Sequence, residues 1–251
     1  MRAIGYLCLA VTAASLPVRA QVPEPILTKL AIPYGPGTGA VKLDYAGGIG
    51  HDSWSSQAIP EAILEVGARD GLEILSRFPL LRANLAGDEA VVGGGQLAMG
   101  ARYLLTGGVS RSYAISIQTV VEAPTGNSRI VGNATEVMPT VLADWRPTVN
   151  VATHSNFTFD RGLGGTGPRV TILEYSDAVA WQAMRHFVPA FEFVGSTNTV
   201  AGRTELVALP EVIVQPGSHL EWKAGFQLGL NAEAPRLGFR AQVAWQWGKH
   251  E

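Results

Sequence analysis

The chain has 251 residues, of which 47% are hydrophobic and 16% charged, with 29 glycines and a formal net charge of −2. This charge argues against a general nucleic-acid binder, which needs a clustered excess of Lys and Arg. The apolar content argues against a disordered chain, and a single cysteine, Cys8, excludes a disulfide scaffold. The length fits one all-β domain, since such domains reach about 250 residues.

Residues 1–20 have the pattern of a secretory signal peptide. Arg2 supplies the positive start, an apolar stretch follows to Leu16, and Val18-Arg19-Ala20 offers a cleavage site. The apolar stretch is shorter than the roughly 20 residues that a membrane-spanning helix needs. We therefore expect removal of residues 1–20, which leaves a mature chain without cysteine.

The rest of the chain alternates between apolar and polar residues with the period of two that is typical of β-strands. Residues 237–247 and 220–230 show it most clearly, with aromatic and aliphatic side chains on one face only. Strands of about ten residues match those that cross a bilayer at a tilt. We expect twelve strands, at residues 39–50, 60–69, 72–81, 92–106, 109–122, 130–145, 148–159, 168–183, 187–195, 204–214, 219–230 and 236–247.

Short and long connections alternate between these strands. Asp70-Gly71, Gly107-Gly108 and Arg146-Pro147 are among the short ones, and the first two suit hairpin turns because glycine tolerates positive φ. Alternation of loop length is typical of outer-membrane barrels, with short periplasmic turns and longer external loops. In a soluble β-sandwich, the alternative fold, nothing requires short and long loops to alternate. We predict an all-β fold, a closed antiparallel transmembrane β-barrel of about twelve strands over residues 39–251, preceded by an N-terminal periplasmic segment at 21–38.

Several stretches resemble the outer-membrane β-barrel family of the MetA pathway of phenol degradation. They are GGGQLAMGARYLL at 93–105, EVGARDGLE at 65–73, APTG at 123–126, Asn156 near its strand end, and FEF at 191–193. The sequence departs from the common outer-membrane pattern at its end, where four residues follow Trp247. The resemblance implies an outer-membrane protein that passes or binds small hydrophobic or aromatic compounds.

Charged side chains on the predicted inward face are the candidates for a substrate path. Glu65, Arg69, Glu73 and Arg77 lie on two strands joined by a tight turn, where opposite charges can pair across the hairpin. Two interpretations stay open: a self-satisfied structural plug, or a selective pathway. The candidate lumen-lining residues are Glu65, Arg69, Glu73, Arg77, Glu136, His154, Asn156, Glu192, Lys223 and Arg240.

His154-Ser155-Asn156 raises the alternative of an outer-membrane lipid hydrolase, because such enzymes pair a serine with a histidine. The two side chains must lie within hydrogen-bond reach, but neighbouring residues on a strand point to opposite faces. We therefore assign no catalytic residue and expect a protein that is not an enzyme. The five histidines have no metal-ligand spacing, so we expect no metal and no cofactor.

The sequence thus favours a channel or transporter in the cell outer membrane for small apolar or aromatic molecules. The alternatives are the hydrolase and a structural barrel with a plugged lumen. The expected partners are outer-membrane lipid and lipopolysaccharide, the outer-membrane assembly machinery and a small hydrophobic ligand, and no nucleic acid is expected.

Overall fold

The computed structural model describes residues 23–49, 60–84, 90–127, 133–165 and 171–248, so the expected signal peptide at 1–20 lies outside the described residues. No helix in this part of the chain is long and apolar enough to cross a membrane. The described strands are β1 (Gly39–Ile49), β2 (Glu61–Arg69), β3 (Leu72–Asn84), β4 (Ala90–Gly94), β5 (Leu97–Gly107), β6 (Tyr113–Ala123), β7 (Thr135–Thr148), β8 (Val151–Leu163), β9 (Thr171–Trp181), β10 (Phe187–Asn198), β11 (Arg203–Val214), β12 (Leu220–Gly229) and β13 (Leu237–Trp247).

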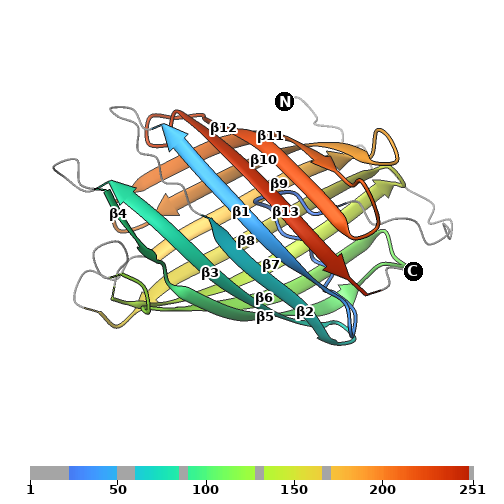
Figure 1. The fold of residues 1–251 in the computed structure, drawn as a ribbon, viewed down its shortest axis with the longest axis horizontal. Helices are drawn as coiled ribbons and strands as arrows, with labels where there is room; N and C mark the ends of the chain where they lie inside the picture. Colours follow the sequence, from blue (N-terminus) through green and yellow to red (C-terminus); the bar gives the residue numbers. More distant parts are fainter. Residues whose placement is uncertain (1–22, 50–59, 85–89, 128–132, 166–170, 249–251) are drawn as a thin grey trace, which may run out of the picture.

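Twelve of these strands close into one antiparallel barrel, which confirms the predicted fold class (Figure 1). Consecutive strands pair with each other, and β1 pairs with both β2 and β13 to complete the ring. Closure removes the free sheet edges at which other chains could pair. The extra strand, β4, pairs only with the last residues of β3.

The strand expected at residues 92–106 is divided into β4 and β5. Leu80 lies opposite Gly94 while Arg77 lies opposite Ala98, so one extra residue is accommodated between them. Pro79 sits at this point in β3; it has no N–H to donate, and its carbonyl accepts the N–H of Gly95 instead. The interruption is therefore a local bulge in one long strand.

The tight turns lie mostly where they were expected. Gly71, Gly107 and Gly108 have φ values of 70°, 87° and 123°, in the region that favours glycine. Arg146-Pro147 was expected as a turn, but both residues belong to β7, and the chain turns after Thr148, which lies opposite Val151. We call the barrel end that carries these short connections the turn end.

The two faces of the barrel wall differ sharply in chemistry. On β13, Phe239, Val243 and Trp245 are exposed on the outside, whereas Gln242 and Ala244 are buried on the inside. The same alternation runs along β6 and β12. The outer surface is therefore a belt of aliphatic and aromatic side chains, while many of the inward side chains are polar or charged.

Candidate functional site

Residues 23–38 lie inside the barrel, where we call them the collar. A periplasmic position was expected for residues 21–38, of which 21 and 22 lie outside the described residues. Figure 1 shows the described part as the blue segment within the barrel. Its contacts follow the order of the strands around the wall. They join Glu24 to β1, Ile26 to β11, Leu27 and Thr28 to β10, Lys29 to β8, Ala31 to β7 and β6, Tyr34 to β3, and Thr38 to β2.

Wall carboxylates hold the collar by its backbone. Glu192 accepts the N–H of Leu27 at 2.9 and 3.0 Å and also that of Thr28. Asp144 accepts the N–H of Ala31 at 3.0 Å. Further along the collar, Glu211 and Glu73 accept the N–H groups of Ile26 and Tyr34 at 3.2 and 2.9 Å. Because buried backbone N–H groups need acceptors, these carboxylates replace the partners that a strand or helix would supply.

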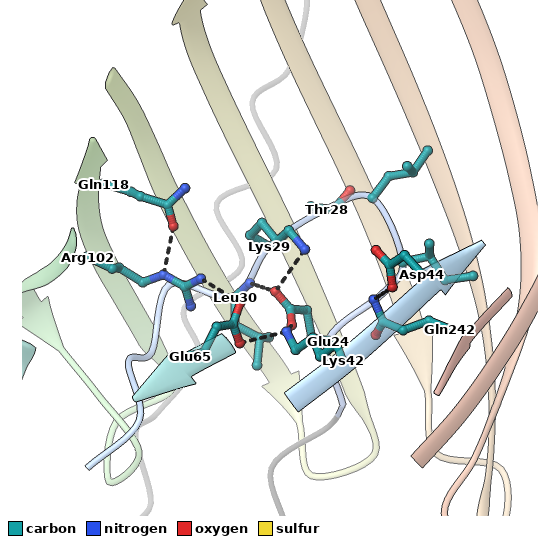
Figure 2. A network of polar contacts seen from close by, with 12 residues as sticks. Glu24, Thr28, Lys29, Leu30, Lys42, Asp44, Glu65, Arg102, Gln118 and Gln242 are labelled. Carbon is teal, nitrogen blue, oxygen red and sulfur yellow. Dashed lines mark hydrogen bonds and ion pairs between the residues drawn. The ribbon is translucent and has the colours of Figure 1, made fainter. Parts of the chain in front are cut away.

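A chain of buried ion pairs joins the collar to the turn-end half of the wall (Figure 2). Lys42 contacts Glu24 of the collar and lies 2.7 Å from Glu65. Arg102 continues the chain, at 3.9 Å from Glu65 and 3.5 Å from Glu73, and its Nε donates to Gln118 at 3.1 Å. Lys42, Glu65 and Arg102 are all buried. Each buried charge is therefore stabilised by its oppositely charged neighbours and would be costly without them.

Glu24 lies on the collar and not on a strand, and its ionisation is set by these neighbours. Burial by itself would raise the pKa of this carboxyl, but the positive charge of Lys42, followed by that of Lys29, holds the pKa well below its ordinary value. Leu30 also donates its backbone N–H to Glu24 at 3.3 Å. The collar therefore starts with a buried ionised acid.

Of two further predicted inward residues, Asn156 binds the collar directly and His154 binds Asp144, which holds the collar. Nδ1 of His154 lies 2.8 Å from Asp144. The amide of Asn156, turned so that its donors face acceptors, donates to the carbonyl of Lys29 at 3.0 Å and accepts its N–H at 2.6 Å. Asn156 therefore positions the collar directly, and His154 does so through Asp144.

The hydrolase alternative requires a serine beside His154. Ser155 is exposed on the opposite face and donates its hydroxyl to Asp177. Ser116 faces inward, but its hydroxyl donates to the carbonyl of Ala31 in the collar. In the described part of the chain, no hydrogen bond joins His154 to a serine hydroxyl.

The remaining predicted residues are Arg69, Arg77, Glu136, Lys223 and Arg240. Arg77 pairs with Glu61 and Glu122 towards the long-loop end, and Glu136 lies half-buried near that end of β7. Arg240 donates to Gln227 at 3.1 Å, and Lys223 lies 3.2 Å from Glu221. Arg69 is exposed beside the turn. Glu65 and Glu73, which were expected to pair across the hairpin of β2 and β3, take their partners from β1 and β5 instead. Arg77 pairs across the hairpin, with Glu61 of β2, and also with Glu122 of β6.

Sequence reasoning missed three members of the site: Glu24, Lys42 and Arg102. Lys42 stands between the exposed Val41 and Leu43, and Arg102 stands between the half-buried Ala101 and the exposed Tyr103. The period-two pattern therefore contained the signal that both face inward. Glu24 carries no such signal, because it precedes the first strand. No group of three or more His, Cys, Asp or Glu among the described residues could hold a metal ion.

Comparisons with known proteins bear on the fold. No protein-family model matches the chain, and no curated protein does. An outer-membrane channel from Pseudomonas putida F1 is similar in structure, with a TM-score of 0.69, 13% identity, and coverage of 90% of this chain and 100% of that one. The NanC porin gives a TM-score of 0.59 at 10% identity, covering 84% of this chain and 99% of that one. The KdgM porin, in complex with disordered oligogalacturonate, gives 0.57 at 9% identity, covering 85% and 99%. The chain therefore shares the barrel fold of solved outer-membrane channels.

Proposed function

We propose that the protein is an outer-membrane channel whose passage is constricted by the collar. The observation that carries the proposal is the circuit of the collar around the inner wall, in a barrel whose outer face is apolar. An apolar outer belt with a polar interior is the arrangement of proteins that span the outer membrane. A segment held by hydrogen bonds rather than by strand pairing is suited to restrict the lumen.

The charge of the wall bears on the class of solute. Acidic side chains outnumber basic ones among the buried ionisable residues that the structure describes. They are Glu24, Glu65, Glu73, Asp144, Glu192, Glu211 and Glu221, against Lys42, Arg102, Lys223 and the histidine His154. An acidic interior disfavours polyanions such as the oligogalacturonate bound by the KdgM porin. Half-buried Leu27 and Leu30 of the collar and the resemblance to the phenol-degradation family support small neutral, apolar or aromatic solutes.

The same proposal includes the location and the partners. The outer belt of apolar side chains would contact outer-membrane lipid and lipopolysaccharide, and insertion of a closed barrel would require the outer-membrane assembly machinery. A small hydrophobic ligand is the proposed solute. The channel performs no chemistry in this proposal.

Conductance in planar bilayers tests the constriction. We expect a small conductance for the full chain and a larger one for a variant with Glu192→Gln and Glu211→Gln, because both changes weaken the hold on the collar. Glu205→Gln is the matched control, since Glu205 is an exposed acid on β11 with no role in holding the collar. If the double variant is folded and neither protein conducts, the channel is refuted and the structural barrel is favoured.

Liposome swelling tests the class of solute. Vesicles that contain the protein are challenged with small neutral aromatic alcohols, with neutral sugars and with galacturonate. We expect the aromatic solute to enter faster than in protein-free vesicles and galacturonate to enter slowest. Equal rates for the sugar acid and the neutral solutes would contradict the part of the proposal that depends on charge.

A further inference from the structure

The exposed charges at the turn end of the barrel are almost all positive. The short connections there, with the strand residues next to them, hold three exposed arginines and two exposed histidines: Arg69, Arg111, Arg185, His186 and His219. Asp70 is the only exposed acid among the described residues of this set. The excess of bases is a local feature, because the formal net charge of the whole chain is −2.

The opposite end of the barrel does not share this excess. Where exposure is described near the long loops, three arginines and three acids are exposed: Arg161, Arg203, Arg236, Glu174, Glu205 and Glu233. Arg203 and Glu233 lie 3.7 Å apart as an ion pair. Exposed charges at the long-loop end are therefore balanced in number and partly paired, whereas those at the turn end are not.

The three exposed arginines of the turn end, Arg69, Arg111 and Arg185, have no acid beside them. In the described part of the chain, none of their guanidinium groups takes part in an ion pair. Asp70 follows Arg69 directly but does not pair with it. A set of like charges without counter-charges in the chain favours an anion from outside it.

Exposed tryptophans show where the turn end meets the membrane. Four of them lie on the outer face, each within three residues of the turn end of its strand: Trp145, Trp181, Trp222 and Trp245. Tryptophan is enriched where the hydrocarbon meets the headgroups. Arg185 follows Trp181 by four residues, and Arg111 precedes Tyr113, the partner of Trp145 in the strand register, by two. These guanidinium groups therefore lie just beyond the tryptophans, at the level of the headgroups.

The bases are distributed around the circumference of the barrel. Four of the five hairpins at the turn end carry one: Arg69 between β2 and β3, Arg111 between β5 and β6, Arg185 between β9 and β10, and His219 between β11 and β12. A protein that docked on one side would contact only some of them. Lipid surrounds a membrane barrel on all sides, so this distribution fits a lipid leaflet.

We propose that the turn end binds the anionic headgroups of the phospholipids around it through Arg69, Arg111 and Arg185. A guanidinium group suits a phosphate because it is planar and can donate two parallel hydrogen bonds to it. Basic side chains are also attracted to a surface of anionic lipid as a whole. The inference rests on the proposed location in the membrane but not on conduction, so it applies equally to a closed barrel.

The test is the lipid preference of the purified protein in vesicles made of equal parts of phosphatidylcholine and phosphatidylglycerol. One of the two lipids is brominated at a time, and quenching of tryptophan fluorescence reports which of them contacts the turn end. Trp54 lies outside the described residues, so every protein compared carries Trp54→Phe. We expect phosphatidylglycerol to be favoured by up to about fivefold, the effect of one basic side chain near an anionic surface. High salt should reduce this preference.

Two triple variants separate the turn-end arginines from a general effect of charge. Arg69→Gln, Arg111→Gln and Arg185→Gln combined should abolish the preference. The matched control combines Arg161→Gln, Arg203→Gln and Arg236→Gln at the long-loop end; it removes the same charge and should keep the preference. Heat-modifiable gel mobility confirms that both variants are folded barrels.

Several results would overturn the proposal. Equal quenching by the two lipids in the unmodified chain does so, as does a preference that survives the turn-end triple variant or disappears in the long-loop one. Equal quenching together with binding of soluble polyglutamate through the same arginines would assign them to an anionic polymer instead. Absence of quenching by either lipid would overturn the proposed membrane location, and this inference with it.

Discussion

The carboxylate of Glu192 on β10 accepts the backbone N–H of Leu27 with both of its oxygens, at 2.9 and 3.0 Å, although the two residues are 165 positions apart. Glu192 is fully buried, and a buried carboxylate is costly unless it is hydrogen-bonded. Leu27 in turn belongs to an irregular segment whose N–H groups have no strand to bind. The carboxylate and the backbone N–H therefore each supply the hydrogen-bond partner that the other needs. Because the contact uses only the backbone of the collar, it does not depend on the side chain of Leu27.

Glu192→Gln should loosen the collar without unfolding the barrel. Hydrogen bonds to a charged group contribute about 1.5–3 kcal/mol and neutral ones about 0.5–1.5 kcal/mol, so each bond to Glu192 should weaken by about 1 kcal/mol. The measurement is hydrogen exchange at the amides of Leu27 and Thr28, which should speed up severalfold. The amides of β10 should be unchanged. Unchanged exchange in the collar would show that Glu192 does not hold it.

Lys42→Met should destabilise the whole protein. The substitution leaves Glu24 and Glu65 buried without the cation that lies between them. Breaking a buried ion pair by removal of one partner costs about 3–5 kcal/mol, and urea unfolding in detergent measures it. Arg69→Met is the control, because Arg69 is exposed beside a turn and should change the unfolding free energy by less than about 1 kcal/mol. Equal effects of the two variants would contradict the role of Lys42.

Acidification should release the start of the collar. The pKa of Glu24 is lowered in the folded protein, so its ionisation contributes stability that is fully present above the ordinary carboxyl pKa of about 4.3. That contribution is lost as the pH falls through the lowered pKa of the folded state. The measurement is conductance against pH for the unmodified chain and for Glu24→Gln. We expect an acid-induced increase that is smaller in the variant; identical profiles would exclude Glu24 as its source.

Val243→Arg should be much more damaging than Leu237→Arg, although both residues are exposed on the outer face of β13. Val243 lies well within the strand, whereas Leu237 is its first residue. A lipid-facing arginine costs about 2–4 kcal/mol at the bilayer midplane and about 0–1 kcal/mol near the interface. Urea unfolding in lipid vesicles measures the difference. Equal tolerance of the two substitutions would contradict a transmembrane position for this strand.

The excess of buried acids predicts that the conducting channel prefers cations. Reversal potentials in a potassium chloride gradient should report the preference, and it should shrink in the variant with Glu192→Gln and Glu211→Gln because two wall charges are removed. Lys223→Gln should shift the reversal potential in the opposite direction, since it removes a base from the same wall. Anion preference in the unmodified chain would contradict this view of the lumen.

The sequence predicted the barrel because the signal for it is local. The alternation of Phe191, Glu192 and Phe193 is enough to direct the acid inward, and the same is true of Lys223 between Trp222 and Ala224. Paired register also follows from short turns such as Asp70-Gly71. The bulge at Gly95 was not predicted, because it depends on which residue of the partner strand, here Pro79, lies opposite.

What the sequence by itself determined is the wall: which residues form strands, which side faces outward, and that the strands close into a ring. Period-two alternation encodes the strands and the side that faces outward, because neighbouring residues on a strand point to opposite faces. The alternation of short and long connections favours the closed barrel. Only the tertiary structure decided what fills the interior. The collar has no periodicity, and its partners on β11, β10, β8, β7, β6 and β3 come from almost the whole length of the chain. Ring closure brings those side chains together around the collar, and a local sequence pattern contains no information about contacts between residues so far apart in the chain.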